Sequence, residues 1–321
     1  MSSFLAPLPR SLILISGEDS TSFLQGLITQ DITLLNGQKS LYSLLLTPQG
    51  RFLYDFFIIP ANPEANCFFI ECDSLDTEKL LKHLTLYKLR SKVNFNLLAS
   101  AQIFAHWSGS LDAFPLGHTL FYDERLLTYQ DPRLSLLGEK IISLDPSSHH
   151  DTLHDLLHAS HEVSLQDYND LLLQNGVPNG SRDMIPGKSI PLECGMEELN
   201  AISWTKGCYM GQELTARVHY QGLVRKRLIP GQLTPLSGLP LGSSLFFKDT
   251  EAGILRSSSN GRGLALLRLE FLETALSLHQ PFQVYSEELY NDTQKNSGSL
   301  ISHPSGTFMP YIPSWMALSG S

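Results

Sequence analysis

The stretch that most limits how this chain can fold is KGCYMGQE at residues 206–213. Two glycines flank a cysteine and a tyrosine there. Glycine adopts backbone angles that are closed to other residues, so Gly207 and Gly211 predict a tight turn that can approach a ligand or another chain closely. Beyond the turn, Leu214 and Val218 have the spacing of one buried helical face. The pattern therefore predicts a turn that holds a thiol, followed by a short helix.

Two interpretations of the thiol of Cys208 follow from its neighbours. A thiol becomes reactive when nearby positive charge favours the thiolate, and Lys206, Arg217 and the basic run at 225–227 are close in sequence. On the other hand, most free cysteines behave as small buried hydrophobic residues, and no histidine base is visibly paired with this one. The residues alone leave both interpretations open.

The motif KGCYxGQE, followed by an arginine and the basic run RKRL, resembles the signature of the YgfZ-type folate-binding proteins. These proteins are relatives of the glycine-cleavage aminomethyltransferase and act in iron–sulfur cluster maturation. The motif is especially close to that of the mitochondrial branch, the late-acting assembly factors for four-iron clusters. The resemblance is strongest over residues 168–228 and weakest after 291. It implies an α+β protein, with an aminomethyltransferase-like folate-binding fold and a C-terminal antiparallel β-barrel.

The length of 321 residues, with 42% hydrophobic and 17% charged residues, predicts a compact protein of two or three domains. We expect residues 1–227 to form the folate-binding region, built of two intertwined α+β subdomains. Short strands separated by Pro, Gly and Ser begin at about residue 228, which is typical of a small antiparallel barrel. Residues 228–321 should therefore form the barrel and a tail. We expect the tail from 291 onwards to be partly loose, with Trp315 docking its end.

A hairpin is predicted over residues 41–46 and 52–59, because Pro48 and Gly50 are typical turn residues. The resembling transferases carry a pair of aspartates on the equivalent hairpin, one of them catalytic beside the folate. Here the pair is Tyr54-Asp55, so one acid remains, which speaks against methylene transfer. Asp55 either faces the folate pocket or is a solvated aspartate at a strand end.

The segment LECGM at residues 192–196 resembles the LEAGM segment of aminomethyltransferases, whose glutamate holds the pterin of tetrahydrofolate. A carboxylate can accept both hydrogen bonds from the adjacent amino and ring N–H groups of a pterin. The resemblance thus implies tetrahydrofolate, or a derivative, as the cofactor and Glu193 as its main ligand. The remaining cofactor-binding candidates are two pocket walls, two arginines for the acidic tail of folate, and two motif residues: Trp204, Tyr209, Arg217, Arg225, Lys206 and Gln212.

No metal site of the chain's own is predicted. The four cysteines form no Cys-x-x-Cys pair and are too scattered for a disulfide framework: Cys67, Cys72, Cys194 and Cys208. His150, His154 and His158 stand four apart, a spacing that can bind a metal, but without a matching carboxylate or cysteine an exposed polar helix face is favoured.

The formal net charge of −9 argues against a general nucleic-acid binder, and no apolar run is long enough to span a membrane. The cysteine usage fits a reducing compartment, and the N-terminus suits neither a secretory signal nor a transit peptide. We therefore expect a bacterial cytoplasmic protein, or the mature form of a eukaryotic protein in the mitochondrial matrix.

Three functions are compatible with these features. The leading hypothesis is a tetrahydrofolate-binding accessory protein that uses Cys208 in assembly or repair of iron–sulfur clusters and works with assembly proteins and client enzymes. The second is a folate-dependent one-carbon (aminomethyl) transferase, which would make the chain an enzyme. The third is a helper of tRNA modification that touches RNA directly, although an indirect effect through cluster-dependent modifying enzymes also fits the leading hypothesis.

Overall fold

The computed structural model describes residues 2–35, 39–61, 66–108, 115–121, 123, 125–145, 160–236, 239–286 and 304–318. The chain forms two compact units that alternate along the sequence. Unit 1 contains Met1–Tyr168 and Leu199–Leu214, and unit 2 contains Asn169–Glu198 and Thr215–Ser321. Residue 227, the expected domain boundary, lies at the start of the first barrel strand, but unit 2 also takes in the earlier segment Asn169–Glu198.

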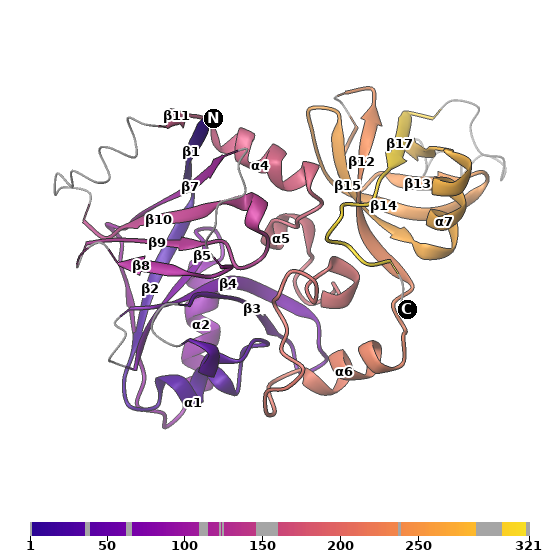
Figure 1. Cartoon of the computed structure of the whole chain (residues 1–321). Coiled ribbons are helices and arrows are strands. Elements are labelled where there is room, and N and C mark those ends of the chain that lie inside the picture. The colour runs from indigo at the N-terminus through magenta and orange to yellow at the C-terminus, as the bar shows by residue number, and fades with distance from the viewer. Residues whose placement is uncertain are drawn as a thin grey trace. The chain divides into compact units, whose positions relative to one another are not determined.

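Unit 1 is built on two sheets (Figure 1). The five-stranded sheet is antiparallel and has the order β3 (Leu41–Leu46), β4 (Phe52–Pro60), β5 (Cys67–Asp73), β2 (Arg10–Ser16), β6 (Asn94–Leu97). The six-stranded sheet has the order β11 (His161–Glu162), β1 (Ser3–Leu8), β7 (Gln102–Ser108), β10 (Glu139–Ser143), β9 (Leu126–Gln130), β8 (Thr119–Phe121). Its strands are antiparallel except β11, which pairs with β1 in parallel.

The five-stranded sheet is covered on both faces, which explains why β3 is buried at every position and β4 at all but one. Helices α1 (Ser20–Gln25) and α2 (Thr77–Lys88) pack against one face through an apolar cluster that includes Ile13, Phe23 and Leu80 (Figure 1). The side chains of the other face meet the six-stranded sheet, and there Tyr129 and Lys140 contact Glu71. The interior between the two sheets is therefore charged as well as apolar.

Unit 2 contains a closed barrel of antiparallel strands in the order β12 (Lys226–Thr234), β15 (Arg262–Arg268), β14 (Thr250–Ser259), β13 (Ser244–Phe247), β16 (Phe282–Tyr285), β17 (Gly306–Pro310). Helix α7 (Leu269–Leu278) follows β15 and contributes Leu272 and Ala275 to the barrel core. The predicted C-terminal barrel is confirmed.

Of the tail from residue 291 onwards, the structure describes residues 304–318. Within it, residues Gly306–Pro310 form β17, which closes the barrel by pairing with β12 on one side and β16 on the other. Without β17 both of these strands would present unpaired edges, which explains why a polar tail is ordered here. Trp315 docks as expected, because its Nε1 donates a hydrogen bond to the carbonyl oxygen of Asn175 at 2.7 Å.

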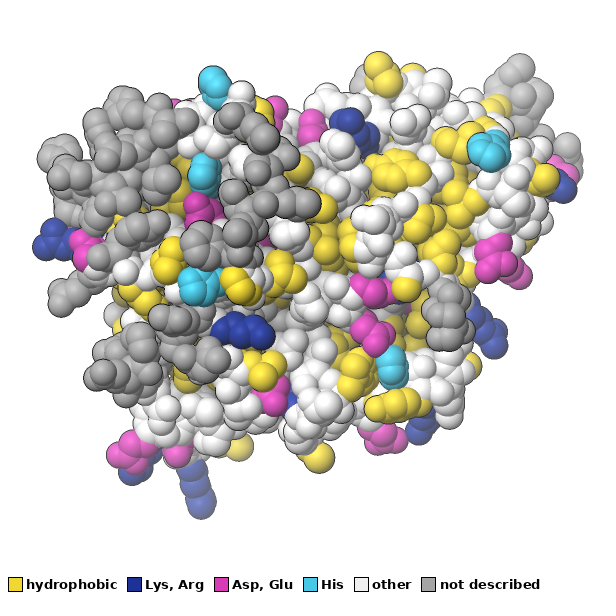
Figure 2. Space-filling view, in the orientation of Figure 1, with side chains coloured by type: hydrophobic (Ala, Val, Ile, Leu, Met, Phe, Trp, Pro, Cys, Tyr) yellow, Lys and Arg dark blue, Asp and Glu magenta, His cyan; other side chains and the backbone are white. Residues whose placement is uncertain are grey.

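Apolar side chains gather on the face of the barrel where α7 and the C-terminal stretch run (Figure 2). The half-buried residues packed against the barrel core there include Phe271, Leu276, Ile312, Trp315 and Leu318. The C-terminal stretch is thus held to the barrel by apolar packing as well as by the β17 ladder.

The segments that carry the candidate site residues are short. Helix α4 (Leu165–Gln174) leads to the single turn α5 (Gly180–Asp183) and to η3 (Pro191–Cys194), and α6 (Gln212–Tyr220) follows the KGCYMGQE motif. The predicted hairpin is found as β3 and β4, and the short helix predicted after the motif is found as α6. The histidines at 149–158 lie outside the described residues. Within the described part of the chain, no helix is both long and apolar enough to cross a bilayer.

Candidate functional site

Lys206 anchors the KGCYMGQE loop, which belongs to unit 1. Its side chain is only 6% exposed, and its Nζ donates to the carbonyl oxygens of Gln25 at 2.8 Å, Ile28 at 2.7 Å and Gln30 at 2.9 Å. Burial lowers the pKa of Lys206 to about 8, against the opposing effect of the nearby Asp31 carboxylate. Because an ammonium group has three hydrogens, these carbonyls occupy all of them, and the structure gives Lys206 the role of fixing the loop to the end of α1.

The residues after the cysteine hold the other end of the loop. Tyr209 is buried, its ring lies 5.1 Å from the Lys206 Nζ, and burial raises its pKa to about 12. Gly211 has φ of +83°, and a Cβ there would lie 2.6 Å from the Thr47 carbonyl oxygen in the β3–β4 turn, so glycine is required. Gly207 has neither a positive φ nor any atom within 4 Å of a Cβ, so its predicted conformational role is wrong.

Cys208 is the exposed residue of this anchored loop. Lys206, two residues before it, and Tyr209, the next residue, are buried, whereas Gly207 and Cys208 are exposed, and Cys208 is a free cysteine. The interpretation of Cys208 as a small buried hydrophobe is therefore wrong. That description fits Cys72 and Cys194, which are buried, and burial raises their thiol pKa values to about 11 and about 12.

The remaining motif candidates lie on the same segment of unit 1. Gln212 begins α6, and its Oε1 accepts a hydrogen bond from the Tyr209 backbone N–H at 3.4 Å while its own N–H donates to the Tyr209 carbonyl oxygen at 3.2 Å. Trp204 is half-buried just before the loop. Gln212 therefore closes the loop onto the first turn of the helix.

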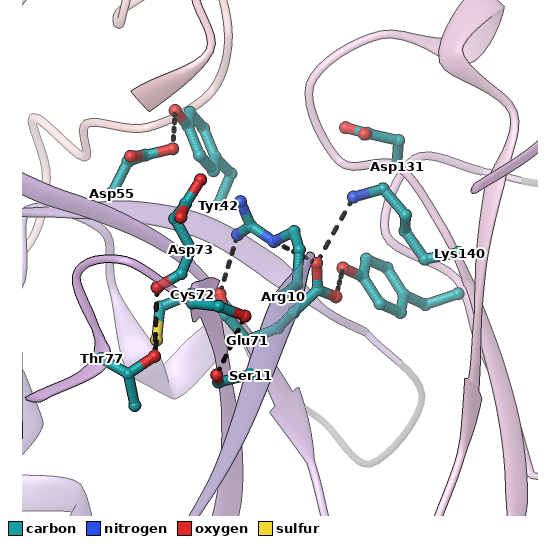
Figure 3. Close-up of polar contacts among 12 residues, drawn as sticks. Arg10, Ser11, Tyr42, Asp55, Glu71, Cys72, Asp73, Thr77, Asp131 and Lys140 are labelled. Atoms are coloured by element: carbon teal, nitrogen blue, oxygen red, sulfur yellow. Dashed lines mark hydrogen bonds and ion pairs between the residues drawn. The ribbon is translucent and has the colours of Figure 1, made fainter. Parts of the chain in front are cut away.

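Asp55 lies in the interior between the two sheets of unit 1, within β4 (Figure 3). It is 8% exposed, and its Oδ2 accepts a hydrogen bond of 2.9 Å from the Tyr42 hydroxyl. Burial raises the pKa of Asp55, and the charge of Arg10, the Tyr42 hydrogen bond and the charge of Arg133 offset this effect only in part. The alternative of a solvated aspartate at a strand end is wrong.

Glu71 is at the centre of the same interior and is fully paired (Figure 3). The Arg10 Nε lies 2.7 Å from its carboxylate, the Lys140 Nζ lies 3.4 Å away, and the Tyr129 hydroxyl donates to it. Burial alone would raise the pKa of Glu71, but the Lys140 and Arg10 cations together with the hydrogen bonds from Tyr129 and Lys140 outweigh burial, so this pKa lies below its ordinary value.

Asp131 and Arg133 form a second buried pair. The Arg133 guanidinium donates from Nε and NH2 to the two carboxylate oxygens at 3.0 Å and 2.7 Å, the bidentate geometry that arginine favours. Burial opposes ionisation of Asp131, yet the paired guanidinium lowers its pKa overall. Three cations surround the Phe57 ring, with Arg10, Arg133 and Lys140 at 5.3, 5.0 and 4.5 Å from its centroid.

The buried charges at 10, 71 and 140 were not among the residues predicted from the sequence. A signal was present, because Glu71 interrupts the apolar run FFIEC and Lys140 precedes Ile141 and Ile142 in a strand. A charge inside a run that reads as a buried strand predicts a buried partner of opposite sign.

Unit 2 carries Glu193 on the η3 turn, where it is half-buried. Arg227, itself 6% exposed, holds this turn: its NH1 donates to the Leu192 carbonyl oxygen at 3.1 Å, and its NH2 pairs with Glu198. The turn ends at Gly195, where a Cβ would lie 3.0 Å from the Trp315 ring. A cation and an aromatic ring thus fix the backbone that presents Glu193.

The arginines proposed for an acidic tail lie in the same unit. Arg217 is exposed on α6, and Arg225 is exposed just before β12. The candidates therefore divide into a unit 1 group, made of Asp55, Trp204, Lys206, Cys208, Tyr209 and Gln212, and a unit 2 group, made of Glu193, Arg217 and Arg225. Among the described residues, no group of three or more His, Cys, Asp or Glu side chains is placed to hold a metal ion.

The architecture defines the class of protein. A solved structure of the glycine cleavage system aminomethyltransferase T from Bartonella henselae superposes with a TM-score of 0.72 at 12% identity, over 99% of this chain and 87% of that one. Residues 225–303 match the family model of the C-terminal β-barrel domain of CAF17. The chain therefore has an aminomethyltransferase-like fold with a C-terminal β-barrel, as the sequence predicted, and the barrel is of the CAF17 type.

Sequence relatives identify the family. The mitochondrial iron–sulfur cluster assembly factor IBA57 of Mus musculus is 34% identical over 290 residues, which cover 84% of this chain and 78% of the mouse protein. The human IBA57 is 32% identical over 84% of this chain and 78% of its own length. The homologue from Coccidioides immitis is 32% identical over 96% and 81%. The chain belongs to the IBA57 family of iron–sulfur cluster assembly factors.

Proposed function

We propose that this protein assists the assembly or repair of four-iron clusters on client enzymes, with the Cys208 thiol as the group that meets the cluster or its components. The observation that carries this proposal is the exposure of Cys208 on a loop that the buried Lys206 anchors and in which Tyr209 is also buried. Such a loop presents one sulfur in a fixed position without requiring the fold to open.

One thiolate is a single ligand, whereas an iron–sulfur cluster is usually held by four. Among the described residues, no three His, Cys, Asp or Glu side chains lie together so as to hold a metal ion. Any cluster at Cys208 is therefore shared with a partner protein that supplies the other thiols. The partners are therefore iron–sulfur assembly proteins and cluster-containing clients. The relatives are named as mitochondrial proteins, so we place this activity in the mitochondrial matrix rather than in a bacterial cytoplasm.

The thiol is tested by replacing Cys208 with alanine or serine in a strain that lacks the protein. We expect both variants to fold and to bind folate as the wild type does, while the activities of four-iron enzymes fall to the level of the deletion strain. Cys67→Ala, at the half-buried cysteine of β5, is the matched control and should rescue fully. Full rescue by Cys208→Ala would show that the thiol has no role.

Tetrahydrofolate is the cofactor that we assign to unit 2. Glu193 is a half-buried carboxylate on a turn fixed by Arg227, which suits a group that accepts two adjacent N–H donors of a pterin. The pterin would supply a recognition element, and a one-carbon carrier if the ligand bears one. Support comes from the turn geometry together with the aminomethyltransferase-like fold.

The folate assignment is tested by calorimetric titration of tetrahydrofolate into the wild type and Glu193→Gln. Loss of a charge-assisted pair of hydrogen bonds should weaken binding by about 2 kcal/mol. Glu270→Gln, at an exposed glutamate of α7, should leave the dissociation constant unchanged. An equal affinity of wild type and Glu193→Gln would remove Glu193 from the site.

Asp55 supports a second candidate function, a folate-dependent one-carbon transferase. A buried carboxyl group with a raised pKa and a single hydrogen-bond donor is typical of an acid that moves a proton. Turnover of formaldehyde with tetrahydrofolate that is abolished by Asp55→Asn would favour this enzyme activity over the assembly role. For tRNA, we expect no direct binding, and any change in tRNA modification should follow the activity of cluster-dependent modifying enzymes.

A further inference from the structure

Two cations of unit 2 lie directly opposite each other at one end of the barrel. Strand β12 begins at Lys226 and β15 ends at Arg268, and these two residues are partners in the antiparallel ladder. Residues in this arrangement have Cβ atoms about 5 Å apart, and two like charges so placed destabilise a sheet. Both side chains are exposed. The ladder therefore holds a like-charge pair that opposes folding.

One weak ion pair is the only direct compensation that the described residues give this pair. Arg268 lies 3.7 Å from Glu270, and both side chains are exposed. Among the described residues, neither Lys226 nor the exposed Arg225 beside it forms an ion pair. The Arg225 carbonyl oxygen accepts a hydrogen bond from the Leu269 N–H at 3.0 Å, which holds this residue beside the end of β15. Three cations thus lie together in a chain whose formal net charge is −9.

Two large apolar side chains precede these cations in the chain. Tyr220 ends α6 with 72% of its surface exposed, and Leu223 is 43% exposed. A Schellman motif fixes the backbone that carries them. Gly222 has φ of +60°, and its N–H donates to the His219 carbonyl oxygen at 3.1 Å. The Leu223 N–H donates to the Val218 carbonyl oxygen at 3.0 Å. An ordered turn therefore presents both apolar groups next to the cations.

The composition of this surface is that of a protein-binding site. Tyrosine and arginine are among the residues that most often anchor protein interfaces, and an apolar centre with a polar rim is usual there. Two apolar side chains and three cations are too few for the broad basic surface of a nucleic-acid site or the long apolar face of a membrane-bound helix. Because the charges are positive, the complementary surface is acidic. We call this set of residues the α6 surface: Tyr220, Leu223, Arg225, Lys226 and Arg268.

We infer that the α6 surface docks an acidic face of the protein that shares the cluster. This inference rests on the function proposed above, in which a partner supplies the other thiols, and it names the chemistry by which that partner is recognised. One continuous helix, α6, leads from the KGCYMGQE loop to the surface (Figure 1). The like-charge pair of Lys226 and Arg268 then has a function, because an acidic partner neutralises both cations. In this assignment Arg225 meets a carboxylate of the partner instead of the acidic tail of folate.

Lys226→Glu tests the inference because it separates stability from binding. It replaces the like-charge pair by an opposite-charge pair with Arg268, so the melting temperature of the full-length protein should rise by about 1 to 3 °C. In a strain that lacks the protein, the same variant should lower the activities of four-iron enzymes at least about fivefold, because like charges then meet across the interface. Lys248→Glu makes the same charge change at an exposed residue between β13 and β14, and it should rescue as the wild type does.

Defined probes test the class of partner. The full-length wild type and Lys226→Glu are titrated at low salt with a poly-L-glutamate peptide, an oligothymidylate of equal charge, and vesicles of phosphatidylcholine and phosphatidylserine. The wild type should bind the peptide about tenfold more tightly than Lys226→Glu does. Tighter binding of the oligothymidylate or of the vesicles than of the peptide would overturn the assignment to a protein partner.

The outcomes separate this inference from the proposed function. Full rescue by Lys226→Glu overturns the role of the α6 surface. A fall in its melting temperature does so as well, because the like-charge pair would then serve the fold. Full rescue by Cys208→Ala, with failed rescue by Lys226→Glu, overturns the role of the thiol and supports the docking surface. Higher stability of Lys226→Glu with lost rescue, and an unchanged Lys248→Glu control, supports the inference.

Discussion

The buried charges of unit 1 and the arginine in the barrel bulge of unit 2 show two ways in which this protein treats a charge removed from water. In unit 1, Glu71 forms ion pairs with Arg10 and Lys140, and Asp131 forms a bidentate ion pair with Arg133. In unit 2, Arg256, at the bulge where the register of β14 shifts against β15, has no direct partner among the described residues. A buried charge with a full set of partners holds the fold together, whereas a half-buried charge without a direct partner contributes little to stability.

Glu71→Ala tests the structural half of this comparison and should have the largest effect. Removing the carboxylate leaves Arg10 and Lys140 buried without a counter-charge, so we expect the free energy of unfolding to fall by about 3 to 5 kcal/mol. Urea unfolding followed by circular dichroism measures the change. Glu270→Ala, at an exposed ion pair of α7, should change stability by less than about 0.5 kcal/mol. Equal effects of the two substitutions would contradict the comparison.

The pH dependence of stability should show the same pairing. The pKa values of Glu71 and Asp131 lie below their ordinary values in the folded protein, so in acid the unfolded chain binds more protons at these groups. Their stabilisation is complete above the ordinary carboxyl pKa of about 4 and is lost as the pH falls below it. Asp55, whose pKa is raised, acts in the opposite direction. Urea midpoints between pH 3 and 7 should fall on the acid side, and Asp131→Asn should flatten that fall.

Asp131→Asn and Asp55→Asn together separate a paired carboxylate from a poorly paired one within unit 1. We expect Asp131→Asn to cost about 2 to 4 kcal/mol, because Arg133 loses its only bidentate partner among the described residues. Asp55→Asn should cost less than about 1 kcal/mol, because an amide can still accept the Tyr42 hydrogen bond. Thermal unfolding of both variants, each compared with the wild type, tests this order of destabilisation. A larger loss of stability in Asp55→Asn than in Asp131→Asn would show that Asp55 stabilises the fold.

Arg256→Gln should have the smallest effect on stability. An arginine without a direct partner contributes little to the fold, so we expect a change within about 0.5 kcal/mol in either direction. Arg227→Gln should cost about 2 to 3 kcal/mol, since it breaks contacts with Leu192 and Glu198. If Arg256→Gln were as damaging as Arg227→Gln, Arg256 would be structural and the comparison between the two units would fail.

Candidate site residues could be proposed from the sequence where the groups that suggest chemistry lie in adjacent residues. The motif at 206–213 and the segment at 192–196 could be found because glycines, a thiol and a carboxylate follow one another closely in the chain. The barrel was predictable for a similar reason, since short strands alternate with Pro and Gly. β17 was not, because a five-residue strand after a polar stretch forms only when two barrel edges are there to pair with it.

The roles of the cations were not predictable in the same way. In the sequence, Lys206 was interpreted as a candidate cofactor-binding residue and Arg227 as part of the basic run near the thiol. The fold buries both, Lys206 against the carbonyl oxygens at the end of α1 and Arg227 against the η3 turn. The sequence does not show whether a lysine or arginine binds a ligand or a backbone carbonyl oxygen, because its partner is distant in the chain.

The sequence by itself determined the family, the presence of an antiparallel barrel of short strands after about residue 228, and one cysteine between two glycines, because local patterns encode these features directly. The tertiary structure decided that the cysteine is exposed while the lysine two residues earlier is buried, and that Arg256 has no direct partner among the described residues. Burial and pairing depend on segments that are far apart in the chain and meet only in the folded protein, so no local pattern can report them.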